Sequence, residues 1–186
     1  GDIDRDGDLD ILQNGYWLQA PANKVTGTWT KRTIVTGYPN RVGATLADID
    51  KDGRLDAILG PSESTGKLGW YRAPANPTTG TWTEKIIDST VAYLHTFKAA
   101  DIDNDGDRDL VTAEMHQSTN PDEVSVYHNN SGGATWTQQV VATTGSHNIR
   151  VADIGKDGDI DIIGANWNDA APDSAVIRMW RNNLKP

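Results

Sequence analysis

The sequence predicts an all-β fold assembled from repeated, four-stranded antiparallel sheets, and three observations lead to this prediction. An acidic nine-residue motif starts at residues 2, 48, 101 and 153, so its copies are 46, 53 and 52 residues apart. The segments that flank each copy are short, apolar and bounded by turn residues, as at residues 42–47, which is typical of buried strands. No segment shows convincing helical periodicity. A regular period near 50 residues indicates a repeat architecture.

The repeated motif has the pattern D-x-D-x-D-G-x-x-D, and its chemistry suits a hard cation. Carboxylates at positions 1, 3 and 5 can converge on one ion, position 7 offers a backbone carbonyl, and the Asp at position 9 closes the shell. Glycine at position 6 allows the sharp turn. Ligands that are all oxygen favour Ca²⁺ over zinc or copper. The fourth copy has Gly155 at position 3, so its site is expected to be weaker or to recruit a water.

We therefore predict three to four Ca²⁺ sites. The predicted side-chain ligands, loop by loop, are Asp2, Asp4, Asp6 and Asp10; Asp48, Asp50, Asp52 and Asp56; Asp101, Asp103, Asp105 and Asp109; and Asp153, Asp157 and Asp161. The position-7 residues, which would contribute backbone carbonyls, are Asp8, Arg54, Asp107 and Asp159. The alternative is an acidic surface turn, but four copies in register argue against it. An EF-hand is excluded because its flanks are helices.

Composition restricts the class of protein. The 186 residues fit a single propeller segment, with repeats at about residues 1–47, 48–100, 101–152 and 153–186. The formal charge of −9 and the lack of a basic stripe argue against nucleic acid, and no apolar run is long enough to insert into a membrane. The loops hold 18 of the 26 acidic residues, which would repel one another without metal. Because free Ca²⁺ is abundant outside cells, we expect a secreted or cell-surface protein.

Each repeat contains four strand-like segments. The first enters the acidic loop, as at residues 147–153, and the second leaves it, as at residues 161–165. The third is short and aromatic, and the fourth carries Thr-Trp-Thr. Four antiparallel strands at this period are the pattern of a β-propeller blade. The repeated Trp29, Trp82 and Trp136 are expected to pack between blades, with stacking on a sugar as the alternative.

The predicted strands are too few to form a closed ring of four blades. The first repeat lacks the strand that enters its loop and the fourth lacks its Trp strand, so fourteen strands are predicted where four blades need sixteen. The chain thus supplies roughly three and a half to four blades. We expect the missing strands to come from the remainder of a longer chain or from a partner, because exposed sheet edges invite pairing.

The motif between two apolar strands, at this spacing, resembles the FG-GAP/VCBS repeat family of β-propellers, whose calcium loops are similar to those of integrin α-chains. The resemblance covers essentially the whole chain. The segments at residues 112–116 and 145–153 are also similar to versions found in secreted bacterial proteins. The resemblance implies a propeller, often seven-bladed, with Ca²⁺ loops on one face. Such domains occur in large extracellular proteins beside glycan-active or adhesive modules.

A second group of candidate residues is expected at the end of the blades opposite the loops. His95 and His147 each precede the first Asp of a loop by six residues, and two outgoing strands end near that same face. Lys98 and Arg150, at equivalent positions of the two entering strands, add positive charge nearby. The predicted ligand-binding residues are His95, Glu114, His116, His147, Asn166 and Trp167.

Three interpretations of this group stay open. In the first, the histidines are packing or turn residues of the repeat; in the second, the group binds a sugar or a protein surface. In the third interpretation His95, Glu114, His116 and His147 hold Zn²⁺, or a histidine serves as a general base in a carbohydrate lyase or dehydratase. The sequence favours an extracellular calcium-binding β-propeller that acts as a binding or adhesion module for a glycan or a protein, with the enzyme as the alternative.

Overall fold

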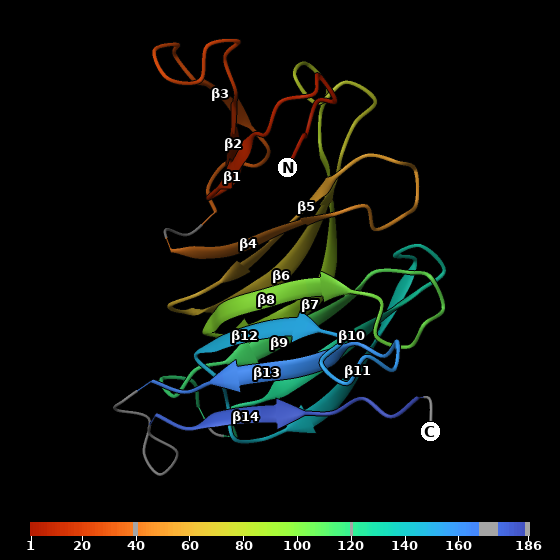
Figure 1. Ribbon diagram of the computed structural model, residues 1–186. Helices are drawn as coiled ribbons and strands as arrows, with labels where there is room; N and C mark the ends of the chain where they lie inside the picture. Colours follow the sequence, from red (N-terminus) through yellow and green to blue (C-terminus); the bar gives the residue numbers. More distant parts are fainter. Residues whose placement is uncertain (39–40, 120, 168–174, 185–186) are drawn as a thin grey trace.

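The chain is all-β in the computed structural model, which describes residues 1–38, 41–119, 121–167 and 175–184 (Figure 1). In this part of the chain fourteen strands form four antiparallel sheets of three, four, four and three strands. The predicted fold class and the predicted distribution of strands are both confirmed. Among the residues described, no helical segment has the length and apolarity needed to span a bilayer.

The strands follow the chain in simple up-and-down order within each sheet. The first sheet comprises β1 (Ile11–Gln13), β2 (Tyr16–Gln19) and β3 (Thr30–Thr33). The second comprises β4 (Val42–Ala47), β5 (Asp56–Pro61), β6 (Thr65–Arg72) and β7 (Thr83–Ala92). The third comprises β8 (Leu94–Ala100), β9 (Asp109–Glu114), β10 (Val124–Asn130) and β11 (Thr135–Ala142). The fourth comprises β12 (Asn148–Ala152), β13 (Asp161–Ala165) and β14 (Ile177–Trp180).

The sheets are arranged like the blades of a propeller. Strands β4, β8 and β12, which begin three successive sheets, pack against one another, and Figure 1 shows them stacked in the middle of the molecule. Each of these three strands leads directly into an acidic loop. The described strands form blade-like parts and do not close a barrel.

Three hydrophobic cores hold neighbouring sheets together. The first two sheets share a core that contains Trp17, Leu59 and Tyr71. The second and third share one that contains Trp70 and Phe97, and the third and fourth share one built on aliphatic side chains such as Val126 and Ile149. Because every core joins two adjacent sheets, the hydrophobic effect fixes each blade against the next.

The Thr-Trp-Thr tryptophans pack as predicted in two of three repeats. Trp82 is 6 % exposed and lies in the core between the first and second sheets. Trp136 packs against the core between the second and third sheets. Trp29 is half-buried and belongs to none of the three cores in the described residues. The sequence placed these tryptophans inside the fourth strand. Trp29 and Trp82 instead lie just before strands β3 and β7.

Candidate functional site

All four acidic loops have the same backbone conformation. The glycine at position 6 has a positive φ in every loop, between 82° and 93°. The residue at position 4 is also left-handed although it is not glycine, with φ of 64° at Arg5, 58° at Lys51, 61° at Asn104 and 56° at Lys156. A non-glycine residue pays a steric cost in this region, so its recurrence at the same position in each repeat indicates a conformation imposed by the loop. Position 4 was not predicted from the sequence.

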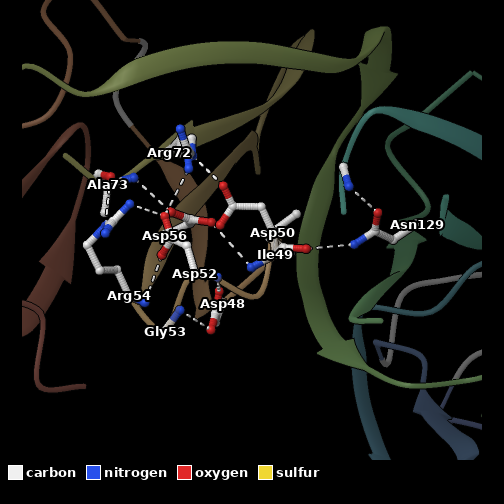
Figure 2. Close-up of polar contacts among 11 residues, drawn as sticks. Asp48, Ile49, Asp50, Asp52, Gly53, Arg54, Asp56, Arg72, Ala73 and Asn129 are labelled. Atoms are coloured by element: carbon white, nitrogen blue, oxygen red, sulfur yellow. Dashed lines mark hydrogen bonds and ion pairs between the residues drawn. The ribbon is translucent and has the colours of Figure 1, made fainter. Parts of the chain in front are cut away.

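The Asp at position 9 anchors each loop to its sheet. Asp56 is fully buried, and its carboxylate accepts hydrogen bonds from the backbone N–H groups of Ile49 at 3.2 Å and Ala73 at 2.7 Å (Figure 2). Burial raises the pKa of Asp56 to about 6, against the opposing effect of these bonds. The same two backbone bonds recur at the other three closing residues, Asp10, Asp109 and Asp161. These bonds therefore tie each loop to its sheet.

The carboxylates at positions 1 and 3 converge in the first three loops. Three groups made only of loop carboxylates bring one ligand atom from each member within 4.8 Å of the others: Asp2, Asp4 and Asp6; Asp48, Asp50 and Asp56; and Asp101, Asp103 and Asp105. A fourth group joins His128 to Asp103 and Asp109 of the third loop. Of the described residues, those of the fourth loop form no such group, in line with its Gly155.

The carboxylate oxygens in these loops fit a cation. The Oδ1 atoms of Asp2, Asp4, Asp50 and Asp101 are buried and accept no hydrogen bond. A buried carboxylate oxygen without a hydrogen-bond donor destabilises the folded state by about 1 to 3 kcal/mol. An ion bound between them would supply the missing partner, and an all-oxygen donor set suits Ca²⁺.

One side chain in each repeat reaches the acidic loop from the strand opposite the closing Asp. Arg72 binds the carboxylates of Asp50 and of Asp52, the latter at 3.1 Å between Nη2 and Oδ2 (Figure 2). The equivalent residue of the first repeat is neutral, and Gln19 donates to Asp4 Oδ2 at 2.5 Å. The other two equivalents are His128, 3.5 Å from Asp103 Oδ2, and Arg181, 2.9 Å from Asp157 Oδ2. The local charge therefore differs from loop to loop, which the motif alone did not reveal.

Neighbouring loops are also joined around the rim. The position-4 side chain of each of the first three loops contacts position 6 or 7 of the next. Arg5 donates to the carbonyl of Gly53, Lys51 pairs with Asp107, and Asn104 donates to Asp159 Oδ1 at 2.9 Å. The Lys51 ammonium lowers the pKa of Asp107. These contacts hold the four loops in one row.

The end opposite the loops carries an aromatic stack. The rings of His95 and His147 lie 4.1 Å apart between centroids, and the ring of Trp167 lies 5.2 Å from that of His147. Trp167 is 53 % exposed, so the stack is open to solvent. Burial lowers the pKa of His147, and the neighbouring charges of His95 and His116 lower it further. The structure thus brings together four of the residues that the sequence placed at this end.

Two predicted members of this group have other contacts. Glu114 lies instead in a neighbouring pocket, where it accepts a hydrogen bond from Ser118 Oγ at 3.0 Å, and burial raises its pKa. The amide of Asn166 donates to the carbonyl of Thr144 at 3.1 Å and thus fastens a turn. Both side chains are therefore held by contacts outside the aromatic stack.

The carboxylate that does face the histidines is Glu63, which sequence reasoning missed. Its Oε1 lies 3.5 Å from His95 Nε2. Glu63 follows β5, so only the packing of the second sheet against the third brings it to His95. Among the described residues, no three His or Glu side chains at this end bring ligand atoms within 4.8 Å of one another, so the Zn²⁺ alternative has no preformed geometry.

Comparison with known proteins supports the repeat assignment. Residues 101–164 match the family model described as an FG-GAP-like repeat. This stretch runs from the third acidic loop through β9 to β12 and into β13, and so includes the fourth loop. A search of curated proteins found no match. The predicted resemblance to FG-GAP repeats is therefore confirmed over residues 101–164, which lie within a row of four propeller-type sheets.

Proposed function

We propose that this chain is an extracellular, calcium-binding β-propeller module that binds a glycan or a protein surface. The observation that carries the proposal is the convergence of unpartnered, buried carboxylate oxygens in three loops of identical conformation. An acidic turn that served only solubility would have no reason to bury those oxygens. The hydrogen bonds that close each loop leave them available to an ion.

The charge of the chain supports calcium and an extracellular location. Four divalent ions would offset eight of the nine net negative charges, most of which come from the loops. Extracellular modules bind Ca²⁺ with dissociation constants of about 10⁻⁴ to 10⁻³ M. At about millimolar Ca²⁺ each site then adds on the order of 0.4 to 1.4 kcal/mol to stability. Three sites add about 1 to 4 kcal/mol, a large share of the stability of a typical domain.

The binding role is supported by the opposite end. The stack of His95, His147 and Trp167 presents a half-exposed indole beside imidazole and carboxylate groups. Exposed aromatic rings with adjacent hydrogen-bonding groups suit the apolar face and the hydroxyls of a sugar, or an aromatic anchor of a protein. A glycan is the first choice, because the platform is small and polar at its edges.

The calcium proposal is tested with two substitutions in one loop. Asp4→Asn removes a predicted side-chain ligand, whereas Asp8→Asn removes the same charge from position 7, where the predicted ligand is the backbone carbonyl. Calorimetric titration should show that Asp4→Asn loses one calcium site and that Asp8→Asn keeps it with slightly reduced affinity. A chelator should lower the melting temperature of the unmodified protein, and Ca²⁺ should restore it. Equal behaviour of the two variants, or a melting temperature that ignores Ca²⁺, would contradict the proposal.

The ligand proposal needs its own test. Trp167→Ala removes the exposed ring of the stack, and Trp29→Ala serves as a control because Trp29 lies outside the described cores and outside the stack. In a glycan array with Ca²⁺ present, Trp167→Ala should lose binding and Trp29→Ala should keep it. Binding that survives in Trp167→Ala would place the ligand elsewhere on the molecule.

A further inference from the structure

A pocket of about 190 Å³ lies where the first strands of three successive sheets meet. Its lining includes Ala44 from β4, His95, Thr96 and Lys98 from β8, and Asn148 and Arg150 from β12. The small Ala44 side chain leaves room opposite the long side chains of the other two strands. The pocket therefore lies on the inner side of the blades.

This pocket is basic although the chain as a whole is acidic. Of the described residues, no Asp or Glu forms an ion pair with Lys98 or with Arg150. Burial lowers the pKa of Lys98, and the neighbouring charge of Arg150 lowers it further. Elsewhere in the described part several cations are paired with carboxylates, as Arg72 and Lys51 are. Two cations held close together without a counter-ion in a concave site are electrostatically unfavourable, and an anion would relieve the repulsion.

The neutral side chains of the pocket are held in place for hydrogen bonding. Thr96 Oγ1 donates to Asn148 Oδ1 at 3.1 Å, which fixes the amide across the junction of the third and fourth sheets. The Asn148 amide nitrogen lies 2.8 Å from His147 Nδ1. Asn148 therefore links the basic pocket to the aromatic stack, and His95 belongs to both.

We infer that this pocket binds the carboxylate or sulfate group of an acidic glycan whose sugar ring rests on Trp167 and the histidines. Arginine presents a planar fork that matches an oxyanion, and lysine adds a second positive charge. The inference rests on the proposed binding function and narrows its ligand to acidic saccharides. The net charge of −9 opposes such a ligand, but screening limits that repulsion to about 8 to 10 Å, and calcium would offset most of it.

The experiment compares defined saccharides by calorimetry in saturating Ca²⁺. The probes are a galacturonic acid oligomer, a sulfated heparin-derived oligomer, a neutral cello-oligomer and poly-aspartate. Lys98→Met and Arg150→Met should each weaken the better acidic saccharide about tenfold and leave the neutral one unchanged. Lys31→Met and Arg108→Met, which remove the same charges outside the pocket, should have little effect. Ala44→Leu, which fills the pocket, should also block the acidic saccharide.

The outcomes separate this inference from the function on which it rests. If the carboxylated or the sulfated oligomer binds more tightly than the neutral one, the inference is supported. The tighter of the two acidic oligomers then identifies the anionic group that the pocket binds. Equal affinity for neutral and acidic oligomers, unchanged by Lys98→Met and Arg150→Met, overturns the inference but keeps the glycan-binding function. Binding of poly-aspartate as tight as that of the acidic saccharides, and insensitive to Trp167→Ala, overturns the saccharide assignment. Failure of every saccharide to bind overturns the proposed glycan function itself.

Discussion

The replacement of Arg72 by glutamine should tighten calcium binding at the second loop. Arg72 contacts the carboxylates at positions 3 and 5 of that loop, where an ion would bind. Glutamine is the residue that the first repeat has at the equivalent position, as Gln19. The substitution therefore removes a competing cation and leaves a side chain that the repeat already accommodates.

The expected gain in calcium affinity follows from the exposure of the Arg72 ion pairs. The Arg72 side chain is 44 % exposed, so solvent screens its interactions. Exposed ion pairs contribute about 0.2 to 1 kcal/mol each, and Ca²⁺ must displace two of them, a total of roughly 0.4 to 2 kcal/mol. Their removal should tighten the second site by about twofold to thirtyfold. Repulsion between the guanidinium and the bound ion acts in the same direction.

Calorimetric calcium titration of the variant and of a matched control provides the assay. Arg41→Gln removes the same charge beside Glu63, at the opposite end of the sheets, and should leave the calcium isotherm unchanged. The reciprocal Gln19→Arg should weaken the first site by a similar factor. If Arg72→Gln binds calcium no more tightly, or more weakly, Arg72 orders the carboxylates and does not compete for them, and the reasoning is wrong.

Three further predictions concern packing and pH. Gly133→Ala should lower the free energy of unfolding in urea by about 1 to 3 kcal/mol more than Gly37→Ala. Both glycines have φ near +75°, but only a Cβ at Gly133 would meet Trp70. Equal losses would mean that the turn at Gly133 relaxes away from the Trp70 ring. Asn129→Ala should lower the free energy of unfolding by about 1 to 3 kcal/mol, because the buried Asn129 amide donates to Ile49 O of the adjacent repeat at 3.0 Å. Asn130→Ala, at a half-exposed site, should lower it by about 0.5 kcal/mol. Similar losses in the two variants would show that the link between the sheets is weak. His147 has a lowered pKa, so the folded state binds its proton less readily than the unfolded state, and stability should be complete above pH 6.5 and fall as the pH drops below that value. Melting temperature against pH should be flatter for His147→Gln, in which the neighbouring His95, His116 and Glu63 are kept. An unchanged slope would assign the effect to groups other than His147.

The sequence was sufficient for features encoded within one repeat. The ligand pattern lies within nine consecutive residues, so its glycine turn and converging carboxylates follow from local geometry alone. The strands were found because apolar and turn residues alternate in each copy, and four copies fixed the register of the repeats. The incomplete first and last sheets followed from the same count.

The sequence was insufficient where a contact joins different sheets. Asn129 and Ile49 are 80 residues apart, and Glu63 reaches His95 only because the second sheet packs on the third. The pocket that Glu114 lines is likewise formed by side chains of both the second and the third sheets.

What the sequence determined by itself was therefore the repeated blade and its acidic loop, because short-range spacing and turn chemistry carry that information. Only the tertiary structure decided which side chain faces each loop, which carboxylate joins the histidines, and that Lys98 and Arg150 share one pocket whose described lining holds no acid. These depend on side chains from adjacent blades, and their juxtaposition is set by the hydrophobic cores between sheets and by no pattern along the chain.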